Sequence, residues 1–169
     1  MGEYIWALRA CCLAMRRAGA AGTVVLAAAV SDFYIPDESL PEHKIQSGAS
    51  SDGSLTMRLE GVPKMLGAVS LPAASASAAA GIAVDDAPWC PDATVVSFKL
   101  ETDEALLLPK ARGAMAKYGV DAVVANILDK RYDECHLVRS DGTEAVIKRD
   151  GRALEAPIAR AILDLPRQS

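Results

Sequence analysis

The segment that decides the fold is TVVLAAAVSDFYIP, residues 23–36. Its first eight residues, 23–30, are uninterrupted by charge, as expected of a strand that is buried on both faces of a parallel sheet. The apolar run then ends in small residues followed by Asp32. Open α/β sheets bind ligands in the crevice outside the carboxyl ends of their strands. The segment therefore predicts a binding site around Ala28, Ala29 and Asp32.

The rest of the chain alternates between strand and helix patterns. Apolar runs predict buried strands at 94–98 and 120–125, and alternation predicts a half-exposed strand at 55–59. Helices are expected at 4–18 and, as a short helix, from Pro63. A further helix, capped by Thr102, should run to about Tyr118 with a kink or interruption at Pro109. The last helix carries Leu154, Ile158, Ile162 and Leu165. Asp141-Gly142 indicates a hairpin between 134–139 and 143–148. The pattern predicts a mostly parallel α/β sheet flanked by helices, with an antiparallel hairpin at its end.

The bulk composition fits one domain. The chain has 169 residues, of which 51% are hydrophobic, so a sizeable core can form across 1–169. The stretch 71–92 is rich in Pro, Ala and Ser, which predicts a flexible insert.

Charge and cysteine usage exclude several classes of protein. A net charge of -4 and 5% aromatic residues disfavour nucleic acid as a partner. The four cysteines lack paired CxxC spacing, so neither a metal site nor a disulfide framework is predicted. Because no run reaches the ~20 apolar residues of a membrane span, a cytoplasmic protein without membrane contact is expected.

A second candidate residue, Lys44, lies downstream of Asp32 in the segment PEHKIQS at 41–47. Lys44 could act there as a point charge that steadies negative charge developing on phosphate or carboxylate oxygens. The alternative is a solvated loop lysine. For Asp32 the alternative is an Asx turn before Tyr34, and for Ala28 and Ala29 it is helix packing against the strand.

Two further strand ends carry candidate ligand-binding residues. Phe98 and Lys99 end one predicted strand, and Asn126 ends the next. Phe98 could stack on a nucleobase and Asn126 could hydrogen-bond to its edge, whereas the structural alternatives are core packing and a turn or helix cap. The sequence has no G-x-G-x-x-G and no P-loop. Together with the absence of a Y-x-x-x-K pair, this disfavours an oxidoreductase.

Taken in order, four motifs resemble the eukaryotic-type phosphopantothenate–cysteine ligases of coenzyme A biosynthesis. They are AAAVSDFYIP at 27–36, PEHKIQS at 41–47, SFKLETD at 97–103 and VANIL at 124–128. The resemblance covers the C-terminal half to two-thirds of that family. It implies a Rossmann-like fold with a flap segment around Lys44, and a homodimer.

The resemblance also implies a reaction and residue roles. ATP, with Mg²⁺ as its counter-ion, would activate the carboxylate of 4'-phosphopantothenate, and cysteine would then attack the acyl-adenylate. Ala28, Ala29 and Asp32 would contact phosphopantothenate, and Phe98, Lys99 and Asn126 the nucleotide. Lys44 would stabilise the charged intermediate. KIQS at 44–47 stands where the CTP-using bacterial enzymes are richer in lysine, so the ATP-using branch is implied.

The sequence departs from the family pattern in one respect. The family's N-terminal half supplies a glycine-rich turn for the triphosphate, an Asn for the acyl-nucleotide step and an Arg for phosphopantothenate. These residues have no counterpart in the 169 residues. A non-catalytic nucleotide-binding or dimerisation module, from a truncated or split ligase, is therefore the alternative to an active enzyme.

Overall fold

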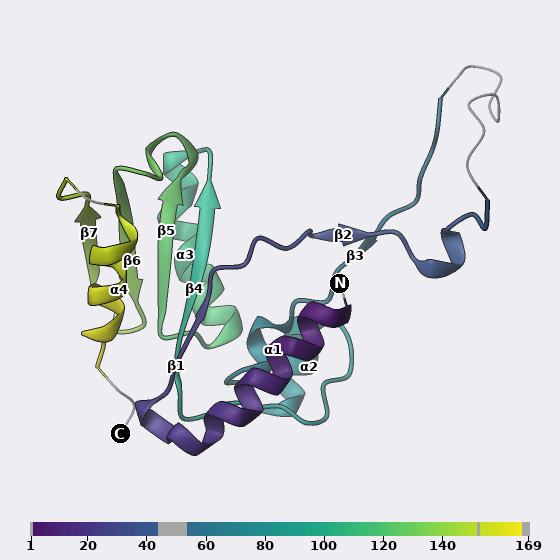
Figure 1. Ribbon diagram of the computed structural model, residues 1–169, viewed down its shortest axis with the longest axis horizontal. Helices are drawn as coiled ribbons and strands as arrows, with labels where there is room; N and C mark the ends of the chain where they lie inside the picture. The colour runs from purple at the N-terminus through teal and green to yellow at the C-terminus, as the bar shows by residue number, and fades with distance from the viewer. Residues whose placement is uncertain (1, 44–53, 152, 167–169) are drawn as a thin grey trace.

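A five-stranded mixed sheet forms the centre of the protein (Figure 1). The computed structural model describes residues 2–43, 54–151 and 153–166. The strand order is β1-β4-β5-β6-β7. The strands are β1 (Thr23–Leu26), β4 (Thr94–Glu101), β5 (Ala122–Ile127), β6 (Glu134–Arg139) and β7 (Glu144–Lys148). β1, β4 and β5 are parallel, whereas β6 and β7 continue the sheet antiparallel. The predicted α/β class, the parallel strands and the C-terminal hairpin are confirmed.

Helices cover both faces of the sheet. α3 (Glu104–Tyr118), α1 (Gly2–Met15) and α2 (Ala73–Ala80) contribute to one core, in which Leu107 and Cys12 pack with Val95 and Val123. α4 (Glu155–Leu163) covers the other face, where Ile158 joins residues such as Val96 and Leu137. Because successive residues of β4 and β5 point to opposite cores, both strands have the continuous apolar character that the sequence showed.

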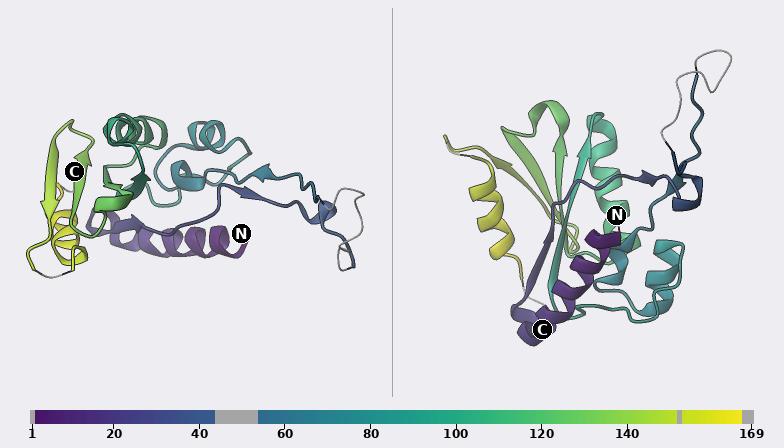
Figure 2. Two further views of the ribbon diagram at one scale, coloured as in Figure 1. Left: turned by 90° about the horizontal axis from the view of Figure 1, so that it is seen from above. Right: turned by 45° about the vertical axis from the view of Figure 1, so that its right-hand side comes forward.

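A long arm projects from this body (Figure 2). It comprises the described residues 31–43 and 54–62, and its two short strands, β2 (Phe33–Tyr34) and β3 (Glu60–Gly61), pair antiparallel near the body. The strand expected at 55–59 is not found, because among the described residues these five have no neighbouring strand with which to form a ladder. Asp37–Ser39 forms a single 3-10 turn.

Several predicted boundaries were wrong. β1 stops at Leu26 rather than at residue 30, so Ala27–Ala29 leave the sheet as irregular chain. β4 and β5 run further than expected and contain Lys99 and Asn126. α3 continues through Pro109 without interruption and is capped at its start by Asp103, whose carboxylate accepts a hydrogen bond from the Ala105 N–H at 2.9 Å.

The segment 71–92 contains ordered structure that its composition concealed. α2 occupies residues 73–80, and Ala76, Trp89 and Cys90 are buried in the core shared with α3. The Trp89 and Cys90 N–H groups donate to the carbonyls of Ala68 and Val69 at 2.8 and 2.7 Å. A run of alanines has high helix propensity, so the low-complexity pattern here indicates a helix rather than an irregular segment. Its status as an insert stays a prediction.

Candidate functional site

The carboxyl ends of the parallel strands surround a pocket of about 360 Å³, which we call the strand-end pocket. It is lined by Ala27, Ala28, Ala29, Phe98, Lys99, Leu100, Asn126, Arg131, Tyr132, Leu154, Glu155 and Ile158. Five of the residues proposed from the sequence therefore line one pocket: Ala28, Ala29, Phe98, Lys99 and Asn126.

A second pocket of about 240 Å³ lies at the base of the arm, and we call it the arm-base pocket. Ala28 and Phe98 line both pockets, so the irregular chain after β1 runs between them. Ser31 and Lys64 line the arm-base pocket only. The short side chain of Ala28 matters here, because a large residue at this place would fill space that now belongs to the pockets.

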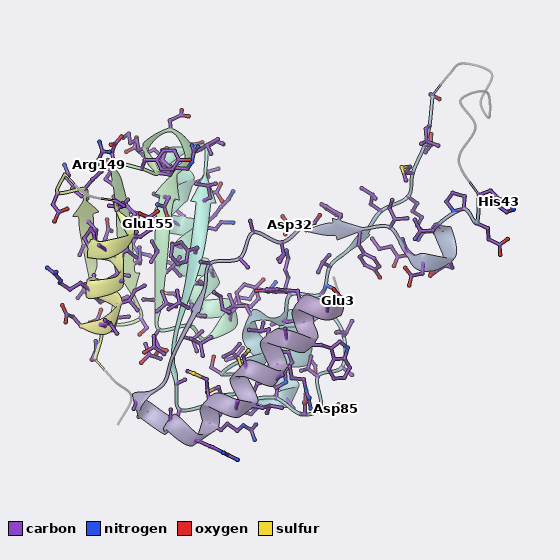
Figure 3. The ribbon with its side chains drawn as sticks, in the orientation of Figure 1. Glu3, Asp32, His43, Asp85, Arg149 and Glu155 are labelled. Atoms are coloured by element: carbon purple, nitrogen blue, oxygen red, sulfur yellow. The ribbon has the colours of Figure 1, made fainter. Side chains whose placement is uncertain are left out.

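Asp32 lies where the chain leaves the body for the arm (Figure 3). Its carboxylate accepts a hydrogen bond from the Lys64 ammonium, and its backbone carbonyl accepts from the Val62 N–H at 2.9 Å. The hydrogen bond and charge of Lys64 lower the pKa of Asp32, and the charge of Lys99 lowers it further. The carboxylate is therefore ionised at neutral pH and holds the two sides of the arm base together.

Lys99 is held at the strand-end pocket by another carboxylate. Its ammonium lies 3.1 Å from Glu101, whose second oxygen accepts a hydrogen bond from Lys110 at 2.7 Å. The Lys110 hydrogen bond, followed by the contacts with Lys99, lowers the pKa of Glu101. Glu101 thus fixes the position of one cation on the pocket wall.

The sequence analysis missed several polar side chains of the pockets, among them Lys64, Arg131 and Tyr132. The Arg131 guanidinium stacks on the Tyr132 ring at 4.3 Å, and it donates to the Tyr132 hydroxyl at 3.0 Å and to the Leu128 carbonyl at 2.5 Å. Arg131 and Lys99 give the strand-end pocket two cations, which suits an anionic ligand. For Arg131 and Tyr132, the available signal was their position shortly after VANIL at 124–128.

The α4 side of the strand-end pocket is also polar at its rim. Glu155 begins α4 and lies beside the sheet (Figure 3). Leu154 and Ile158 contribute apolar lining to the same pocket. Phe98 is partly exposed and belongs to neither buried core. Its ring is therefore available to a planar ligand, whereas the core-packing alternative predicted a buried ring.

Lys44, the remaining candidate, lies outside the described residues. Within the described part of the chain no cluster of three or more His, Cys, Asp or Glu side chains could hold a metal ion. No described helix is both long and apolar enough to cross a membrane.

Comparisons with known proteins give one consistent result. The rice phosphopantothenate–cysteine ligase 2 is 39% identical over 163 residues, which are 96% of this chain and 44% of the relative. The mouse phosphopantothenate–cysteine ligase is 38% identical over 165 residues, 97% of this chain and 47% of the relative. The chain thus spans about half the length of the curated relatives it matches. No protein-family model matches it.

The solved structures agree. A Cab2 mutant in complex with phosphopantothenate-cysteine superimposes with a TM-score of 0.76 at 30% identity, covering 95% of this chain and 48% of that one. A second structure of the same mutant gives a TM-score of 0.74. The resemblance noted in the sequence motifs is therefore confirmed over nearly the whole of this chain.

Proposed function

We propose that this chain forms part of the active site of an ATP-dependent ligase of this kind. Almost its whole length is similar to about half the length of each phosphopantothenate–cysteine ligase that it matches. It would join 4'-phosphopantothenate to cysteine in coenzyme A biosynthesis. One observation supports this most strongly: five residues proposed from three separate motifs line a single pocket at the strand ends.

The proposed reaction has two steps. An oxygen of the phosphopantothenate carboxylate attacks the α-phosphorus of ATP, and pyrophosphate leaves. The amino group of cysteine then attacks the acyl carbon, AMP leaves with the bonding electron pair, and the amine loses a proton as the amide forms. Activation is needed because a free carboxylate is a poor acyl donor to an amine. Mg²⁺ would arrive with the nucleotide as its counter-ion.

In this proposal the pockets have separate roles. Phe98 stacks on the adenine, Asn126 hydrogen-bonds to the nucleotide, and Lys99 faces its phosphates. Phosphopantothenate contacts Ala28, which lines both pockets, and Ala29, which lines the strand-end pocket. It also contacts Asp32, which pairs with Lys64 of the arm-base pocket. Lys44 stabilises the charged intermediate. The two cations of the strand-end pocket support the assignment, because negative charge develops on the α-phosphate during the first step.

The homodimer and the cytoplasmic location remain parts of the proposal. The exposed apolar residues of the arm, among them Phe33, Leu55 and Leu59, are compatible with a second subunit. No nucleic-acid or membrane partner is proposed.

The test is turnover by the purified chain. Pyrophosphate release is measured with ATP, Mg²⁺, phosphopantothenate and cysteine, and the product is identified by mass. We expect the Asp32→Asn variant to lose activity, because the neutral amide removes the negative charge that pairs with Lys64 at the proposed substrate site. The matched control is Asp37→Asn, an exposed carboxylate in the 3-10 turn of the arm.

The alternative is a nucleotide-binding module without turnover. ATP binding without pyrophosphate release or product would support that module. Equal activity in the Asp32→Asn variant and the parent would remove Asp32 from the proposed mechanism.

A further inference from the structure

We propose that Glu155 selects the nucleobase. Its carboxylate accepts a hydrogen bond from an exocyclic amino group, and it thereby favours adenine over a purine that carries an oxo group at the same position. The inference rests on the proposed function, in which the strand-end pocket holds the nucleotide and Phe98 stacks on the base. Glu155 lines that pocket together with Phe98 and Asn126.

The alternation of side chains along β4 and β5 sorts the lining of the pocket between the two faces of the sheet. Val96 of β4 and Val124 of β5 pack in the core beneath α4. A residue two positions further along a strand points to the same face. Phe98 and Asn126 therefore point to the face that α4 covers, and the proposed base-binding residues lie together on it.

The cation of β4 belongs to the opposite face. Lys99 follows Val96 by three positions, so its side chain points away from α4. Its ammonium lies 3.1 Å from Glu101, which also binds Lys110 of α3. The pocket is therefore bipolar, with an aromatic and amide end for the base on the α4 face and a cationic end for the phosphates.

Glu155 lies at the base end of this pocket. β7 runs parallel to β5, because each of them is antiparallel to β6. α4 follows β7 and so begins near the edge of the sheet where β4 and β5 end, and Figure 3 shows Glu155 at this end of the helix. Its side chain is exposed and takes part in no hydrogen bond or salt bridge within the described part of the chain. The carboxylate is therefore available to a ligand.

The two polar side chains at the base end differ in what they can distinguish. The Asn126 amide carries both a donor and an acceptor, so by rotating it pairs equally well with an amino or an oxo group. An ionised carboxylate only accepts hydrogen bonds. An amino group on the base donates to Glu155, whereas an oxo group would set two acceptors against each other. The discrimination is therefore assigned to Glu155 and not to Asn126.

The test compares the affinities of the full chain for ATP and for inosine triphosphate, measured by titration calorimetry in the presence of Mg²⁺. Inosine triphosphate has an oxo group where ATP has its exocyclic amino group, and it carries the same ribose and phosphates. We expect ATP to bind at least about tenfold more tightly, because a hydrogen bond to a charged group contributes at least this factor. Only binding is measured, so the outcome does not depend on ligase turnover.

Two carboxylates at the two ends of α4 provide matched variants. Glu155→Gln replaces the acceptor by an amide that can also donate to an oxo group, so the preference for ATP should fall by about tenfold. Asp164→Asn removes the same charge from an exposed residue at the other end of the helix, and the preference should stay unchanged. Circular dichroism checks that both variants fold, and the comparison of the two nucleotides on the parent chain requires no variant.

Equal affinity of the parent for the two nucleotides would overturn the inference and leave the nucleotide site in place. So would a full preference for ATP in Glu155→Gln. If Glu155→Gln weakened both nucleotides equally but left 2′-deoxy-ATP unaffected, the carboxylate would contact the ribose and not the base. Absence of binding by either nucleotide would overturn both the inference and the proposed nucleotide site. Selective binding of ATP without turnover would contradict the proposed ligase function alone.

Discussion

Both the body and the arm of this protein contain apolar residues, but the body buries a large share of its own, whereas most of those in the arm are exposed. In the body, Leu137 and Val123 are fully buried between the sheet and a covering helix. In the arm, Leu55 and Leu59 alternate with polar residues yet remain exposed. An apolar sequence pattern therefore indicates which residues can be buried. Their burial also requires a second layer of secondary structure that packs against them. The arm has no such layer within the described chain.

The largest effect should come from the body. Replacing Leu137, which is 0% exposed, by alanine removes buried methyl groups from the core beneath α4. We expect the free energy of unfolding to fall by about 2–5 kcal/mol. Urea denaturation followed by circular dichroism measures the change. A loss below about 1 kcal/mol would mean that the α4 core is loosely packed.

A smaller effect is expected at the rim of the body, where Glu101 binds Lys99 and Lys110. The folded pKa of Glu101 is lowered, mainly by the Lys110 hydrogen bond. Its contribution is therefore present above the unfolded pKa of about 4.3 and is lost as pH falls through the lower folded value. Because the lysines are partly exposed, Glu101→Gln should cost only about 1 kcal/mol at pH 7.

The pH dependence separates this ion-pair effect from a packing effect. Urea midpoints of the parent and of Glu101→Gln should converge as pH falls through the lowered folded pKa of Glu101, because the parent carboxylate then also becomes neutral. A difference that persists unchanged at low pH would show that the substitution acts through packing.

The smallest effect is predicted for the arm. Leu59, which is 52% exposed, is the matched counterpart of Leu137, and Leu59→Ala should change the free energy of unfolding by less than about 0.5 kcal/mol. The same urea experiment measures both leucine variants. If Leu59→Ala proved as costly as Leu137→Ala, the arm would have to be packed in solution, for example against a second subunit, and the comparison would fail.

The sequence predicted those parts of the structure in which local pattern and tertiary packing agree. The hairpin at Asp141-Gly142 is confirmed, with Gly142 at a φ of 85° and the Asp141 carboxylate accepting from the Thr143 N–H at 2.8 Å. The apolar spacing of Leu154, Ile158, Ile162 and Leu165 correctly predicted the face of α4 that packs on the sheet.

Prediction failed where long-range contacts decide the outcome. The alanine-rich 73–80 gave no amphipathic pattern, although Ala76 is buried in the core. The pairing of Lys64 with Asp32 joins residues 32 positions apart, and no local spacing indicates it. In the candidate site, the sequence indicated which strand ends converge, but the polar partners Arg131 and Lys64 depend on how the loops pack.

The most direct test of the central claim, that the strand-end pocket holds the nucleotide, is calorimetric titration of the chain with ATP and Mg²⁺. Its two phenylalanines allow a matched pair, because Phe98 lines the pocket and Phe33 lies on the arm. We predict saturable binding that Phe98→Ala weakens by about 1–3 kcal/mol, the value of one base stacked on an aromatic ring, and that Phe33→Ala leaves unchanged. Binding that is absent, or that Phe98→Ala does not affect, would contradict the account.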